Sequence, residues 1–170
     1  MKDYSQMDSF LENIKEYKKQ MEKGAVQAAY KGLMKYIMDL KTYFKTRYPE
    51  YFVSGSIYYG YMDMTYFSFF PEVLKERKLK VAVVFLHDKF RFEVWLAGYN
   101  KQIQKKFWNL MREKNWKKYR LVTSLKGSDS IAEHILADNP DFSNLDNLTK
   151  TIEKRILMFI QDIVSFLSDN

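Results

Sequence analysis

The chain of 170 residues contains no cysteine. This absence excludes a disulfide framework, catalysis by a thiol and metal binding by thiolates. It also agrees with a reducing compartment, and we expect a cytoplasmic protein. No run of about 18 consecutive apolar residues is present, and residues 1–6 lack the basic and then apolar order of a secretory leader. We therefore expect no membrane segment and no targeting segment.

The sequence also lacks the motifs of nucleotide, metal and serine chemistry. Its six glycines form neither the Gly-x-Gly-x-x-Gly nor the Gly-x-x-x-x-Gly-Lys pattern that holds phosphates. His87 and His134 are too far apart for the His-x-x-x-His spacing of a metal site, and we predict a turn for His87 and a helix surface for His134. Residues 127–130 lack the second glycine of a Gly-x-Ser-x-Gly elbow. The motifs predict no cofactor and no metal centre.

The composition is that of a folded, basic protein. Hydrophobic residues make up 46% of the chain, which is enough for one core, and no linker or repeat divides it. We therefore predict a single domain over residues 1–170. The net charge is +7, and residues 101–126 alone hold nine bases and one acid, a net charge of +8. The charge is thus concentrated in one segment, which favours an acidic partner or a polyanion.

Two helices are predicted at the start of the chain. Apolar residues recur at three- and four-residue spacing over 7–21, after a possible cap at Asp8 and before Gly24. The same spacing continues over 26–48, where Pro49 ends it. Each segment is amphipathic, so each helix is expected to have one apolar face.

The middle of the chain predicts strands. Residues 52–70 are rich in β-branched and aromatic side chains around a turn at 60–63, which indicates a hairpin. Residues 79–86 and 90–97 form a second pair of strands around 87–89. We therefore expect four antiparallel strands.

The last part of the chain returns to helix. Apolar residues between Ile103 and Met111 alternate with lysines and predict a basic amphipathic helix. Residues 119–123 predict a fifth strand, residues 128–136 a short helix, and residues 148–167 a long C-terminal helix. The predicted fold is α+β: two N-terminal helices, a mostly antiparallel sheet of four to five strands, a basic amphipathic helix and a long C-terminal helix.

The residues most suggestive of catalysis lie on the predicted strand 90–97. Strand alternation sends Arg91, Glu93 and Trp95 to one face. Glu93 could then act as a base or metal ligand while Arg91 holds an anionic group. The alternative is an ordinary surface ion pair on a solvated strand face, and we favour it.

A divergent metal-dependent nuclease is a second catalytic hypothesis. A carboxylate on an antiparallel hairpin is typical of restriction-endonuclease-like folds, and Glu93 with Asp63 or Asp88 could bind magnesium. Those folds carry a Glu-x-Lys pair, but the position of its lysine is taken by Trp95. An active enzyme would need a lysine from elsewhere, such as Lys80 or Lys89, so we lean against enzymatic activity.

Aromatic and basic residues suggest binding instead. Alternation cannot bury all the aromatic residues of the first hairpin, so one face could stack bases, a flat ligand or a peptide. The alternative is that helices and loops cover both faces. Likewise, bases interleaved with aromatics could neutralise phosphates or contact an acidic protein, unless they form only a solvated helix face. The predicted binding residues are Tyr58, Tyr59, Tyr66, Arg91, Trp95, Lys105, Lys106, Trp108, Lys117 and Lys118.

Four stretches carry a family resemblance. They are YKGLM at 30–34, FVSGSIY at 52–58, EVWLAGYN at 93–100 and DFSNL at 141–145. They resemble those of a bacterial family of small single-domain proteins of unknown function, over nearly the whole chain. The resemblance implies a bacterial and cytosolic origin, and it assigns no catalytic residue.

From the sequence we expect a non-enzymatic binding module for a polyanion such as nucleic acid, or for an acidic protein, through a basic and aromatic surface. One alternative is the nuclease-like enzyme. Another is a pocket for a small anionic or aromatic ligand between the first hairpin and the second helix. No membrane partner is expected.

Overall fold

The computed structural model describes residues 4–170. The chain divides into two compact units, of which the first ends at Asp39 and the second is Leu40–Asn170. The single domain over residues 1–170 stays a prediction.

The first unit contains helix α1 (Tyr4–Lys23) and the start of helix α2 (Ala25–Arg47), as the apolar spacing predicted. Gly24 separates the two helices with a φ of +73°, a left-handed conformation that glycine adopts without strain. Phe10 on α1 is 60% exposed, and Leu11 and Tyr17 are exposed as well. The apolar face of α1 therefore meets solvent.

The second unit contains a six-stranded antiparallel sheet with the order β1-β2-β3-β4-β6-β5. The strands are β1 (Tyr51–Val53), β2 (Met64–Pro71), β3 (Leu79–Leu86), β4 (Arg91–Gly98), β5 (Arg120–Leu121) and β6 (Ala132–Asp138). The helices of this unit, besides the end of α2, are α3 (Glu72–Glu76), α4 (Lys101–Glu113) and α5 (Leu145–Ser168). The α+β prediction is confirmed, with one strand more than expected.

Two local predictions need correction. The short helix predicted over 128–136 is wrong, because residues 132–138 form strand β6. Pairing of β6 with β4 overrides the helix propensity of that segment, and it places His134 on a strand. The hairpin predicted over 52–70 is only partly formed: β1 pairs with β2, while Tyr58 and Tyr66 make an isolated bridge within an irregular connection.

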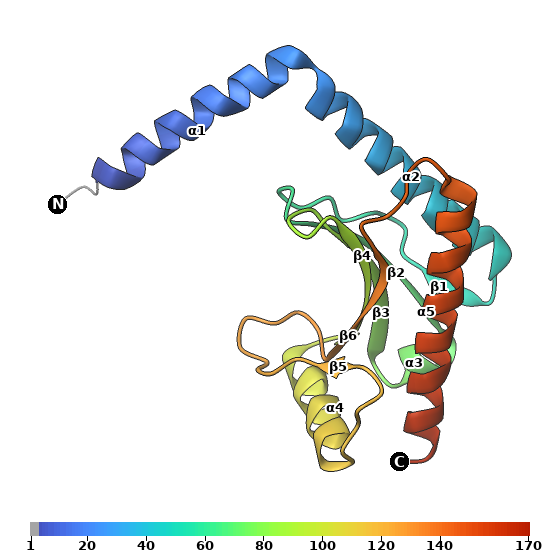
Figure 1. The fold of residues 1–170 in the computed structure, drawn as a ribbon. Helices are drawn as coiled ribbons and strands as arrows, with labels where there is room; N and C mark the ends of the chain where they lie inside the picture. Colours follow the sequence, from blue (N-terminus) through green and yellow to red (C-terminus); the bar gives the residue numbers. More distant parts are fainter. Residues whose placement is uncertain (1–3) are drawn as a thin grey trace. The chain divides into compact units, whose positions relative to one another are not determined.

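One face of the sheet forms the main core. Helix α5 lies along this face (Figure 1), and its residue Phe159 is fully buried. The end of α2 contributes Phe44, whose ring centroid is 4.5 Å from that of Phe69 and 6.2 Å from that of Phe67. These aromatic contacts attach α2 residues of the second unit to strand β2.

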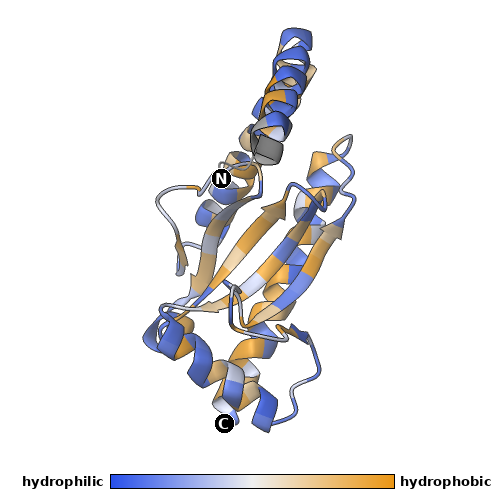
Figure 2. Ribbon diagram, turned by 90° about the vertical axis from the view of Figure 1, so that its left-hand side faces the viewer, coloured by the Kyte–Doolittle hydropathy of each residue, from blue (hydrophilic) through white to orange (hydrophobic). Residues whose placement is uncertain are grey.

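The opposite face of the sheet is only partly covered. Figure 2 looks onto this face, with α5 behind the sheet. Ala82 and Val84 on β3 are buried there under Met64, Tyr66 and Trp95, which form a small second apolar cluster. The register sets Tyr66 beside Val84 and Trp95 beside Ala82. We call this surface the open face.

None of the helices in residues 4–170 is both long enough and apolar enough to cross a membrane.

Candidate functional site

The predicted set Arg91, Glu93 and Trp95 lies together on the open face. Arg91 Nε donates to Glu93 Oε1 at 2.7 Å, and Trp95 Nε1 donates to Glu93 Oε2 at 2.7 Å. Glu93 is only 3% exposed. The alternation that places the three side chains on one face is confirmed. The solvated surface ion pair between Arg91 and Glu93, which we favoured, is wrong. Glu93 is buried, and strands β3 and β6 flank it on both sides.

This geometry limits what Glu93 can do. Each of its carboxylate oxygens already accepts a hydrogen bond from a neighbour on the same strand. Each oxygen keeps a second lone pair, but at 3% exposure the carboxylate has little access to a substrate or a metal ion. The arrangement therefore fixes the Arg91 and Trp95 side chains on the open face.

The other two catalytic candidates lie in turns. Asp63 accepts from the backbone N–H of Tyr61 at 2.9 Å, and hydrogen bonds from the backbone N–H groups of Met64 and Tyr61 lower its pKa. Asp88 is exposed in the β3–β4 turn. Within residues 4–170, no group of three or more His, Asp or Glu side chains is arranged to hold a metal ion.

Two histidines are half-buried without facing each other. His87 Nε2 lies 2.9 Å from Thr65 Oγ1, and burial lowers the pKa of His87, partly offset by Asp63 and Asp88. Burial and the nearby charge of Arg155 lower the pKa of His134. Neutral imidazole is therefore the favoured form of both residues.

Three predicted aromatic residues meet in one hollow on the open face. The rings of Tyr58 and Tyr66 are stacked, with centroids 5.0 Å apart and planes at 28°. Together with Trp95 they line a hollow of about 350 Å³, which we call the aromatic hollow. Tyr59 is outside its lining. The remaining lining residues are Met64, Lys80, Ala82, Val84, Ala97, Gly98, Tyr99, Asn100, Lys101, Gln104 and Asp129, none of them from α2.

A basic shelf adjoins the aromatic hollow. A second hollow of about 570 Å³ shares Lys80, Tyr99 and Asn100 with the first, and Lys75 and Lys78 also line it. Its lining contains no carboxylate. Lys75 is paired with Glu72, whereas Lys78 and Lys80 have no ion pair with any residue in the described part of the chain. We call Lys75, Lys78 and Lys80 the lysine shelf.

The predicted basic helix is α4, but its basic side chains point in different directions around the helix. Lys105 and Lys106 are exposed, and successive helix positions point about 100° apart. Trp108 is not free for stacking, because its Nε1 donates to the carbonyl of Val122 at 2.8 Å and Arg112 covers its ring at 4.5 Å. These residues therefore do not form one surface with the aromatic hollow.

Lys117 and Lys118 lie just before β5, the edge strand of the sheet. They line a hollow of about 300 Å³ together with Arg91 and Glu93. The charge of Lys118 is largely matched, since its Nζ donates to Asp162 at 2.6 Å. Burial alone would raise the pKa of Asp162, but hydrogen bonds from Lys118 and the Tyr119 hydroxyl lower it overall.

The middle of the open face carries charges of both signs. A hollow of about 700 Å³ is lined by five carboxylates and three bases. The carboxylates are those of Asp63, Asp88, Glu93, Asp129 and Glu133. Three of these carboxylates have basic neighbours, because Arg91 pairs with Glu93, Lys101 lies 3.9 Å from Asp129 and Arg120 lies 3.9 Å from Glu133.

Sequence reasoning missed the lysine shelf and Gln104. Lys80 sits two and four positions before Ala82 and Val84, so strand alternation could have placed it on the open face. Gln104 gave no signal, because it lies on the buried side of α4 among apolar residues.

Comparison with curated proteins and with solved structures finds no match. A family model, in contrast, matches residues 10–167, which is nearly the whole chain. The chain therefore belongs to the family described as Domain of unknown function (DUF7000).

Proposed function

We propose that the protein is a non-enzymatic binding module that holds single-stranded nucleic acid on the open face. The observation that supports this most is the position of the aromatic hollow directly beside the lysine shelf. Aromatic rings stack on any base, and lysines neutralise phosphates. A duplex keeps its bases stacked inside, so a single strand is the form that can insert a base into the hollow.

Charge favours this end of the face over the segment 101–126. A strand running across the middle would pass five carboxylates, whereas the shelf has none. We therefore place the base against Tyr58, Tyr66 and Trp95, and the phosphates over Lys78 and Lys80. An acidic protein partner would need the lysines but not the aromatic hollow. In the cytoplasm of a bacterium, which the resemblance and the lack of cysteine suggest, single-stranded RNA is available as a ligand.

The first test is fluorescence anisotropy with labelled single-stranded RNA, single-stranded DNA and duplex DNA over a salt series. Single strands should bind and duplex should not. Two phosphate contacts, from Lys78 and Lys80, predict that log K falls with log salt at a slope of about −1.4. Absence of binding at low salt, or equal binding of the duplex, would contradict the proposal.

Variants then locate the site. Tyr58→Ala should weaken binding by roughly 5- to 160-fold, because stacking contributes about 1–3 kcal/mol per base. Replacing Lys78 and Lys80 together by Gln should reduce the magnitude of the salt slope by about 1.4. Lys154→Gln, at an exposed position of α5 on the opposite side of the sheet, is the matched control and should change neither. If Lys154→Gln weakened binding as much as the site variants do, the binding site would lie elsewhere.

A further inference from the structure

Gln104 is a buried polar side chain that lines the aromatic hollow. It lies on α4 and is only 3% exposed. Gly98 allows this position, since a Cβ atom there would be 2.4 Å from the backbone nitrogen of Gln104. The close approach of α4 to the end of β4 thus holds the Gln104 amide at the wall of the hollow.

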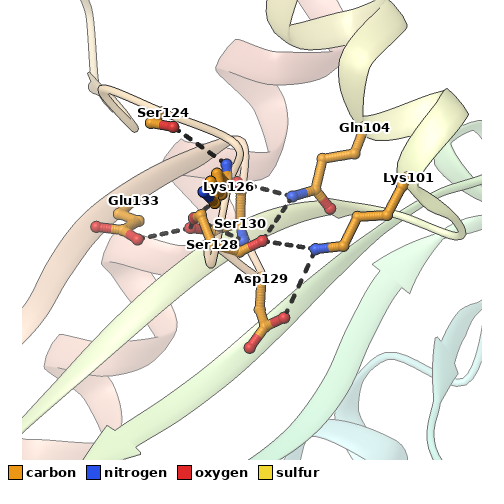
Figure 3. Close-up of polar contacts among 8 residues, drawn as sticks. All are labelled: Lys101, Gln104, Ser124, Lys126, Ser128, Asp129, Ser130 and Glu133. Carbon is orange, nitrogen blue, oxygen red and sulfur yellow. Dashed lines mark hydrogen bonds and ion pairs between the residues drawn. The ribbon is translucent and has the colours of Figure 1, made fainter.

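The orientation of the Gln104 amide is fixed by its partners. Its Nε2 donates to the carbonyl of Ser128 at 3.0 Å and to the carbonyl of Ser130 at 3.2 Å. Both partners are acceptors, so the amino group and not the oxygen must face them. Figure 3 shows the oxygen turned away from these carbonyls. Among residues 8–170, whose side chains the structure describes, none donates a hydrogen bond to it.

The loop that holds this amide is itself anchored. Lys101 Nζ donates to the same Ser128 carbonyl at 2.8 Å and lies 3.9 Å from Asp129 (Figure 3). Ser130 Oγ donates to Glu133 at 2.6 Å. Reversing the Gln104 amide would therefore set its oxygen against two fixed carbonyls. The Gln104 oxygen is therefore an acceptor with a fixed orientation on a residue that lines the hollow.

We infer that the hollow prefers a base with an amino group at C4 of a pyrimidine or at C6 of a purine, which means cytosine or adenine. This inference rests on the proposed function, because it names the base that the aromatic hollow takes. An amino group donates to the Gln104 oxygen, whereas the O4 carbonyl of uracil or thymine would face it as a second acceptor. A buried acceptor left unmatched lowers affinity, and we expect a preference of about tenfold.

The test compares octamers of cytidine and uridine. Both are pyrimidines with the same number of phosphates, so differences in stacking and charge are small. The cytidine octamer should bind about tenfold more tightly to the wild-type protein. An octamer of N4-methylcytidine keeps one N–H and should retain most of the preference. An octamer of N4,N4-dimethylcytidine has no N–H donor and should lose the preference.

Protein variants separate recognition from loop structure. Gln104→Met removes the acceptor at similar volume and should bring the cytidine-to-uridine affinity ratio close to one. Ser130→Ala loosens the same loop through Glu133 but leaves the Gln104 oxygen in place. It should change both affinities equally and keep the ratio. If Gln104→Met does not fold, binding of the methylated octamers to the wild-type protein tests whether the cytidine amino group is recognised.

The outcomes are distinct. Equal binding of cytidine and uridine octamers would overturn this inference and leave the proposed function standing. No binding of any single strand would overturn both. A cytidine preference that survives both N4,N4-dimethylation and Gln104→Met would overturn the role given to Gln104.

Discussion

The buried position of Glu93 predicts a large loss of stability when its carboxylate is removed. Glu93→Ala would leave the guanidinium of Arg91 and the indole N–H of Trp95 without their acceptor. Breaking a buried ion pair by removing one partner costs about 3–5 kcal/mol. The Arg91 side chain is 19% exposed, so water replaces part of the loss. We therefore expect about 2–4 kcal/mol, or a fall in Tm of roughly 5–12 °C for a domain of this size.

Conservative and compensating variants test the reason for this loss. Glu93→Gln keeps one oxygen but turns an amino group toward a second donor, and should cost about 1–2 kcal/mol. Replacing Arg91 by Met and Glu93 by Leu together removes both charges, and should cost less than Glu93→Ala alone. The measurement is urea unfolding followed by circular dichroism, with ΔG taken from the linear extrapolation.

An exposed ion pair provides the control. Lys35 Nζ and Asp39 Oδ2 are 2.6 Å apart on α2, with side chains 74% and 60% exposed. Asp39→Ala should cost no more than about 0.5 kcal/mol. If Glu93→Ala costs as little as Asp39→Ala, the account of Glu93 as a buried acceptor is refuted.

Three further predictions concern packing, pH and the placement of α4. Phe159→Ala should cost about 3–5 kcal/mol in urea unfolding because Phe159 is fully buried, whereas Phe10→Ala at an exposed site should cost less than about 0.5 kcal/mol; similar losses would contradict the assignment of the core face. Burial favours neutral His87 and His134 and lowers the pKa of each, so the unfolded chain binds more protons as pH falls below about 6.5 and the free energy of unfolding should decrease there. Replacing both histidines by Asn should make the free energy of unfolding, measured in urea at several values between pH 7.5 and 5.5, depend less on pH. An unchanged pH dependence would count against this reasoning. Gly98→Ala should destabilise the protein by about 1–3 kcal/mol and weaken RNA binding in anisotropy titrations, because the new methyl group displaces the start of α4; wild-type binding would contradict this.

Much of the fold could be predicted because its signals are local. The spacing of apolar residues predicted α1, α2 and α5, and two apolar, β-branched runs around the turn at 87–89 predicted β3 and β4. Strand β6 could not be found this way, since residues 132–138 contain good helix formers and become a strand only by pairing with β4. Likewise, local sequence does not determine whether the residues around Tyr58 pair fully with β2 or form a loop with the single bridge from Tyr58 to Tyr66.

The site was predictable only where one strand determines it. Alternation brought Arg91, Glu93 and Trp95 together, because neighbours two positions apart on a strand share a face. Their burial depends on β6 and could not be read from one strand. The charge run 101–126 suggested one basic surface, but the turn of α4 and the carboxylate of Asp162 divide and neutralise it. The lysine shelf combines residues of α3, β3 and the turn between them, so no contiguous sequence motif predicts it.

The most direct test of the central claim is ultraviolet cross-linking of a mixed-sequence single-stranded RNA to the protein, followed by mass spectrometry of the cross-linked peptides. The account predicts cross-links at Tyr58, Tyr66 or Trp95, and their loss when Lys78 and Lys80 are both replaced by Gln at moderate salt. Cross-links confined to α5, or to the Lys105–Lys118 segment, would contradict it.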